Sequence, residues 1–110
     1  MKSDAVLKII SRTPGEPFRR NTVVNNIPAY NEFVGGVCDI IDKNGYLVVF
    51  DMQGQYHGGR PNALIEGTKI YGDMFIARTT KYGDFGDMPL SDPGVFVKVE
   101  NLFEEIYCYG

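Results

Sequence analysis

An Asn-Gly pair at residues 44 and 45 constrains the fold more than any other feature of this sequence. It separates two runs that are rich in β-branched and aromatic residues, VCDIIDK at 37–43 and YLVVFDM at 46–52. Both positions of a two-residue type I′ turn need positive φ, which asparagine and glycine adopt at low cost. The pair therefore predicts a β-hairpin over residues 37–52. Because its second arm is almost continuously apolar, we expect that arm to be a central strand covered on both faces.

Two further segments have the composition of β-strands. Residues 4–11 are rich in Val and Ile and end at the proline-marked turn TPGEP, which predicts a first strand. Residues 70–79 predict another strand, in which Gly72 marks a bulge or a close approach of two backbones. Residues 18–26 fit either a short extended segment or a loop.

Helical spacing of apolar residues predicts a short helix at about 27–34. Pro28 lies near its start, where a missing N–H does no harm. Asn25 and Asn26 are available as caps, and Gly35–Gly36 supplies a left-handed exit.

A second helix is expected near the end of the chain. Asp92 is its predicted cap and Pro93 its first residue. The β-branched run VFVKV at 95–99 leaves a strand open as the alternative at that point. The apolar stripe that favours the helix comprises Val95, Val99, Leu102, Phe103 and Ile106.

These elements predict a single domain over residues 1–110 with an α+β fold. We expect a small, twisted, mostly antiparallel sheet of about four strands, with two helices packed on it and the 37–52 hairpin at its centre. A chain of 110 residues has room for one core. Its hydrophobic content of 44% and aromatic content of 13% argue against disorder.

The charges argue against a nucleic-acid partner, because a net charge of −3 provides no general basic field. The distribution is uneven: residues 1–37 carry five basic and three acidic groups, whereas residues 76–110 carry three basic and six acidic groups. Arg19 and Arg20, in the basic part, have the charge to close over an anion.

Cysteine and histidine usage predicts no metal site and no cofactor. Cys38 and Cys108 are far apart in sequence and each has apolar neighbours, so we expect both to be reduced and unbridged. With one histidine in addition, no spacing resembles a zinc site. No apolar run approaches the ~20 residues of a membrane span and no signal peptide is recognised, so we expect a cytoplasmic protein without a membrane partner.

Two glycine-rich stretches, 54–67 and 81–92, are expected to be long loops. Irregular loops of this length in a small domain are usually functional or disordered, although both stretches also fit ordinary surface connections. They lack an assembled catalytic group. His57 is the only imidazole, and a single loop histidine is more often solvated than catalytic. The segment GDFGD at 83–87 contains the DFG triplet found in kinases, but none of the other kinase motifs is present. We therefore expect no enzymatic activity.

Recognition chemistry is present in these loops. Arg60 offers a guanidinium for a phosphate or a carboxylate, and Asn62 an amide suited to a base edge. Tyr71 is one of three tyrosines that could stack on a planar ligand. In the alternative interpretation Asn62 caps a turn and Arg60 is only solvated. The candidate ligand- or partner-binding residues are Arg60, Asn62, Tyr56, His57, Tyr82, Arg19 and Arg20.

The order of these signals resembles the small proteins grouped as domain of unknown function 3846. The resemblance covers roughly residues 5–105. The motifs that carry it are VGG (34–36), the hairpin, PN (61–62), Gly72, GDF (83–85) and LSD (90–92).

This sequence departs from the family pattern at two points. The loop asparagine of the family is often followed by a basic residue, whereas Asn62 is followed by Ala63. The final helix of the family usually opens with acidic residues after the LSD-like cap, whereas in this sequence the cap is followed by Pro93–Gly94–Val95. The resemblance implies a phage, plasmid or other mobile element, a setting in which small non-enzymatic proteins that blunt host defences are common.

Residues and resemblance together predict an accessory protein of a phage or mobile element that acts by stoichiometric binding and inhibits a host or defence protein. The alternative is sequestration of a small, nucleotide-like anion. Its pocket would be lined by Arg60, Asn62 and nearby tyrosines, and a homo-oligomer could share it between subunits.

Overall fold

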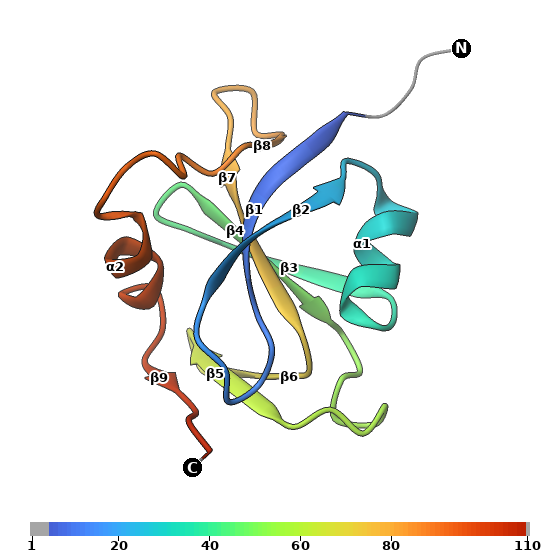
Figure 1. Ribbon diagram of the computed structural model, residues 1–110. Coiled ribbons are helices and arrows are strands. Elements are labelled where there is room, and N and C mark those ends of the chain that lie inside the picture. Colours follow the sequence, from blue (N-terminus) through green and yellow to red (C-terminus); the bar gives the residue numbers. More distant parts are fainter. Residues whose placement is uncertain (1–4, 110) are drawn as a thin grey trace.

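Two antiparallel β-sheets and two short helices make up the structure, a computed structural model that describes residues 5–109 (Figure 1). The elements are β1 (Val6–Arg12), β2 (Arg19–Val24), α1 (Ile27–Val34), β3 (Cys38–Lys43), β4 (Tyr46–Asp51), β5 (Pro61–Ile65), β6 (Thr68–Tyr71), β7 (Met74–Thr79), β8 (Phe85–Gly86), α2 (Val95–Glu100) and β9 (Glu105–Ile106). The larger sheet has the order β2-β1-β7-β4-β3, with β8 paired to β7, and the smaller sheet has the order β6-β5-β9.

The predicted α+β class, the antiparallel pairing and the two helices are confirmed, but the strand count is wrong. Nine strands in two sheets occur in the described residues, where about four were expected. The supposed loop 54–67 contains β5, which turns through Glu66 and Gly67 into β6. Strands β8 and β9 have two residues each, too short for any periodic pattern to show.

The hairpin of β3 and β4 is confirmed. Asn44 and Gly45 have φ values of 54° and 83°, as a type I′ turn requires. Val48 and Val49 of β4 are both fully buried, so this strand is covered on both faces as predicted. The hairpin is nevertheless not the centre of the sheet. Strand β7 is central because it pairs with β1 on one side and β4 on the other, and β3 forms an edge.

Three other predicted segments differ in extent from the structure. Strand β1 begins at Val6, and residue 4 lies outside the described residues. The ambiguous segment 18–26 contains strand β2. The strand expected at 70–79 is divided into β6 and β7 at Gly72, whose backbone approaches that of Gly59 closely, as predicted for this glycine.

Helix α1 has the predicted bounds and caps. The side-chain oxygen of Asn26 accepts a hydrogen bond from the Ala29 N–H at 2.8 Å, and Gly35 leaves the helix with φ of 92°. Both caps satisfy backbone groups that a helix end leaves without intrahelical partners. The short helix therefore begins and ends where the sequence indicated.

Helix α2 is confirmed as a helix but is shorter than expected. Its N-cap is Gly94, and Asp92 lies outside the helix, where its Oδ1 accepts the Gly94 N–H at 2.9 Å. The chain leaves the helix at Asn101, so Ile106 belongs to β9 instead of the helical stripe. The helix ends early because the residues that follow it pair with β5. The Glu104 N–H donates to the Leu64 carbonyl at 2.8 Å.

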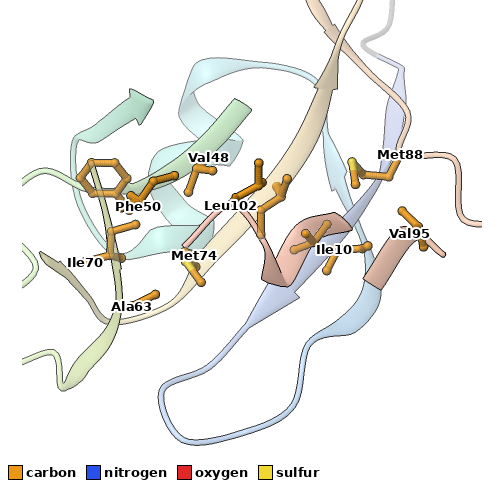
Figure 2. Packing of buried hydrophobic residues seen from close by; sticks show 12 residues of the cluster. Ile10, Val48, Phe50, Ala63, Ile70, Met74, Met88, Val95 and Leu102 are labelled. Carbon is orange, nitrogen blue, oxygen red and sulfur yellow. The ribbon is translucent and has the colours of Figure 1, made fainter. Parts of the chain in front are cut away.

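The larger sheet carries a packed layer on each face. Alternate residues of β1, β4 and β7 point to opposite sides, as the two-residue period of a strand dictates. Ile9, Val49 and Phe75 pack with Tyr30 of α1. On the other face, α2 and the smaller sheet cover a second cluster (Figure 2). Burial of each such side chain stabilises the fold by about 1.5–3 kcal/mol.

The two glycine-rich stretches lie at opposite ends of the larger sheet. Figure 1 shows the connection between β7 and β8 at one end, and the connection after β4 at the other end, with β5 and β6. The C-terminal segment and the β1–β2 connection also lie at this second end. The two stretches therefore do not form one site, and the end with the smaller sheet gathers the chemistry described next.

Candidate functional site

The structure separates several of the predicted site residues. Tyr82 is exposed in the β7–β8 connection, remote from the smaller sheet. Arg19 and Arg20 are exposed on the edge strand β2. Tyr56 is 86% exposed in the connection after β4. Of the predicted residues, Arg60 lines a pocket of 580 Å³ and Tyr56 one of 190 Å³, whereas Asn62 is fully buried.

Asn62 is fully buried and joins three parts of the chain. Its Nδ2 donates to the main-chain carbonyls of Arg12 at 2.8 Å and Gly72 at 2.9 Å, and its Oδ1 accepts from Arg12 Nη1 at 2.7 Å. An amide whose donors and acceptor are used in this way has no group left for a ligand. Asn62 therefore has an architectural role, but it joins distant segments from within β5 instead of capping a turn, as the alternative interpretation had it.

Arg12 is the partner of Asn62 and is itself only 3% exposed. Its Nη1 donates to Asn62 Oδ1 and to the Asn62 carbonyl, and its Nη2 donates to the Tyr107 carbonyl at 2.8 Å. Burial lowers the pKa of the guanidinium from its ordinary value, because desolvation disfavours the charged form. Arg12 belongs with Arg19 and Arg20 to the basic part of the sequence but was not among the candidate site residues, and its place at the end of the run VLKIIS is the signal that could have singled it out.

The pocket beside Arg60 has a volume of 580 Å³. Gly15 from the β1–β2 connection, Gly59 and Arg60 from the connection before β5, and Asp73 line it. Tyr109 forms a wall, and the Arg60 Cζ lies 3.7 Å from the centre of the Tyr109 ring. A cation held over a ring face at this distance is attracted by the ring quadrupole, so the guanidinium is positioned before any ligand arrives.

Tyr109 is held in place by its own contacts. Its hydroxyl donates to the Pro61 carbonyl at 2.6 Å. The ring edge lies against Gly15, where an added Cβ would be only 2.8 Å from Tyr109 Cδ2, and the φ of +83° there also favours glycine. The position of the ring therefore depends on residues from two distant parts of the chain.

His57 is paired with Asp51, a residue that was not among the predicted site residues. Its Nδ1 lies 2.6 Å from Asp51 Oδ2, and the exposed fractions of the two side chains are 46% and 3%. Asp51 Oδ1 also accepts the Gln53 N–H at 2.9 Å. The pair resembles the base and orienting acid of a catalytic triad. Among residues 5–109, however, Asp51 provides the only hydrogen bond of the imidazole, and no nucleophile is bonded to it.

Cys38 and Cys108 are both free thiols. No cluster of three or more His, Cys, Asp or Glu residues that could hold a metal ion occurs in the described part of the chain. Within the same residues, no helix has the length and apolar character that crossing a membrane requires.

A scan against protein-family models, a search of curated proteins and a search of solved structures each found no match to this chain. The resemblance to domain of unknown function 3846 stays a prediction.

Proposed function

We propose that this protein is a non-enzymatic binding protein and that it holds a small, nucleotide-like anion in the pocket beside Arg60. The observation that carries the proposal is the stacking of Arg60 on Tyr109 at 3.7 Å, at the wall of a 580 Å³ pocket. That volume lies within the range of roughly 300–1,000 Å³ that is usual for small-molecule sites.

The free donors of Arg60 support binding of a phosphate. Its side chain makes no hydrogen bond or ion pair with another residue of the described chain, so its N–H groups remain free. A guanidinium can offer two parallel N–H donors to the oxygens of a phosphate or carboxylate. The exposed part of the Tyr109 ring adds an aromatic surface on which a base can stack.

Acidic groups in the same pocket favour a ligand of low charge. Asp73 and Glu16 line it together with Arg60. Their carboxylates can accept hydrogen bonds from ribose hydroxyls or base amino groups, but they repel additional phosphates. A nucleoside monophosphate therefore fits the pocket better than a triphosphate.

Inhibition of a host or defence protein is the second candidate function. Its specific support is a group of exposed side chains at the open end of the β3–β4 hairpin. Val37 is 66%, Met52 57% and Tyr56 86% exposed, and the Met52 N–H donates to the Val37 carbonyl at 2.9 Å. Tyrosine and methionine are enriched in protein interfaces. The resemblance adds the mobile-element setting to this proposal, and the sequence features described above add an expected cytoplasmic location.

Titration of the purified protein with AMP tests the first proposal, with calorimetry as the readout. We expect saturable binding of intact AMP, and this binding should weaken in the Arg60→Ala variant. The control variant is Arg78→Ala, which also removes one exposed arginine, on β7, and should bind AMP like the wild type. Absence of AMP and GMP binding would refute the nucleotide proposal. Turnover of the ligand to product would refute the non-enzymatic one.

Recovery of the protein from a host lysate tests the second candidate. A stable complex that is lost in Tyr56→Ala supports a protein partner on the hairpin surface. A complex that is unaffected by this substitution and by Met52→Ala would exclude that surface.

A further inference from the structure

The β1–β2 connection separates the Arg60 pocket from a second pocket of 380 Å³. The two pockets share only Gly15 and Glu16 of this connection. The inner wall of the second pocket includes Arg12, and its sides are formed by Phe18, Phe96, Ile106 and Cys108. It thus combines a buried cation with apolar walls.

The charge of Arg12 has no acidic partner in the described residues. Only two ion pairs occur there, His57–Asp51 and Lys98–Asp92. The strong hydrogen bonds of Arg12 all go to neutral oxygens of Asn62 and Tyr107. A buried charge is costly unless it is paired, so an anion from outside would gain a partner that is already desolvated and fixed in place.

One donor of Arg12 is both unused and accessible. Its Nε makes no hydrogen bond to any residue of the described chain. Nε is also not fully enclosed, because Thr79 Oγ1 is the only buried side-chain N or O atom without a hydrogen-bond partner in the described residues. Arg12 itself lines the pocket, so the ligand proposed below can use this donor. The remaining Nη2 contact, to Cys108 Sγ at 4.0 Å, is long and weak, so Nη2 also retains capacity for an oxygen acceptor.

The walls select the body of the ligand. The Phe18 ring centre lies 5.6 Å from Arg12 Cζ, and Phe18 stacks on Phe103 with a centroid distance of 5.9 Å. Together with Phe96 and Ile106 these side chains form a surface for an aromatic or aliphatic group.

The rim selects the charge of the ligand. Glu16 and Glu100 line the same pocket and are exposed. Their carboxylates repel a second negative charge on a ligand that Arg12 already holds by the first. The pocket is thus complementary to a single anionic group on an apolar body.

We propose that this pocket is a second binding site, specific for a small monocarboxylate on an aromatic or aliphatic body, whose carboxylate binds to Nε and Nη2 of Arg12. It is independent of the nucleotide proposal because its lining differs and Arg60 does not belong to it.

Alkylation of Cys108 by iodoacetamide provides a local readout. Cys108 is exposed and lines the pocket, whereas Cys38 lies on strand β3 and serves as the internal control in the same mass spectrum. We expect benzoate to slow alkylation of Cys108 but not of Cys38. The neutral isostere benzamide should require a concentration at least roughly tenfold higher, because it lacks the charge-assisted contact.

Three controls decide the proposal. Inorganic phosphate should not protect Cys108, and equal protection by phosphate or by benzamide would overturn specificity for a carboxylate with an apolar body. Arg60→Ala should leave benzoate protection unchanged, whereas loss of protection would place the ligand in the other pocket.

A gain-of-binding variant avoids the risk that removal of Arg12 unfolds the protein. Glu100 is exposed at the end of α2, and its side chain makes no hydrogen bond or ion pair with another described residue. Glu100→Gln should lower the benzoate concentration for half protection by roughly twofold or more, because one repulsive charge is removed from the rim. An unchanged or higher concentration would contradict the charge argument, and thermal unfolding would verify that the variant is folded.

Discussion

Arg12 and Asn62 are joined by hydrogen bonds that involve both their side chains and their main chains. The guanidinium donates to both oxygens of Asn62, and the Asn62 amide donates to the Arg12 carbonyl at 2.8 Å. The pair ties the end of β1 to the start of β5, and Arg12 extends the link to Tyr107 after β9. One buried contact therefore joins the larger sheet to two strands of the smaller one.

Replacement of Asn62 by alanine should be strongly destabilising. It removes three side-chain hydrogen bonds, which a buried guanidinium donor, the buried Arg12 carbonyl and the partly buried Gly72 carbonyl then lose. We expect the free energy of unfolding to fall by roughly 2–5 kcal/mol. Urea denaturation measures the loss. Asn101→Ala, at an exposed helix end, is the matched control and should change it by less than about 0.5 kcal/mol. A similarly small effect of Asn62→Ala would refute the architectural role.

Replacement of Arg60 by alanine should act on binding and not on folding. Arg60 is exposed, and its stacking on Tyr109 contributes only about 0.5–1 kcal/mol at such a site. Loss of a charge-assisted contact should weaken AMP binding by roughly 1.5–3 kcal/mol. Calorimetry measures the affinity, and thermal unfolding monitors the fold. If Arg60→Ala and Arg78→Ala bind AMP equally well, Arg60 does not contact the ligand.

Turns and helix ends could be predicted from the sequence where they depend on neighbouring residues alone. The Asn44–Gly45 turn and the Asn26 and Gly35 caps each depend on residues a few positions apart, so they could be recognised without the fold. Strand β9 has no such local signal, because Ile106 fits a helical stripe equally well. Its conformation is decided by pairing with Ala63, far away in the chain.

The candidate site was predictable only in part for the same reason. Arg60 could be chosen because a guanidinium in a glycine-rich stretch suggests anion binding. Its stacking on Tyr109, and the hydrogen bonds of buried Arg12 to Asn62 and Tyr107, join positions that are distant in sequence. A single sequence contains no local pattern for contacts of that range.

Glu104 should make part of the stability depend on pH. Its carboxylate accepts the N–H groups of Glu66 at 2.9 Å and Gly67 at 3.1 Å, at the turn between β5 and β6. These bonds, the Gly67 bond first, hold the pKa of Glu104 below its ordinary value of 4.5. A lowered pKa in the folded state means that the stabilisation is complete above pH 4.5 and is lost as the pH falls through the lowered pKa.

Urea midpoints of the wild type and Glu104→Gln, measured from pH 7 to pH 2, test this assignment. The variant should be less stable at neutral pH, and the difference should shrink below pH 4.5. Glu32→Gln, an exposed change on α1, is the control and should show no such convergence. A difference between wild type and Glu104→Gln that stays constant across the range would contradict the assignment.

His57 should contribute to stability and not to catalysis. Removal of the imidazole leaves the Asp51 carboxylate, only 3% exposed, without its side-chain partner. The free energy of unfolding of His57→Ala should therefore fall by roughly 1–3 kcal/mol. Tyr56→Ala, at the adjacent and 86% exposed position, should change it by less than about 0.5 kcal/mol. A general base would show the opposite pattern, an intact unfolding transition together with lost turnover of a substrate. Equal stability of His57→Ala and the wild type would thus remove the structural role and reopen the question of an enzyme.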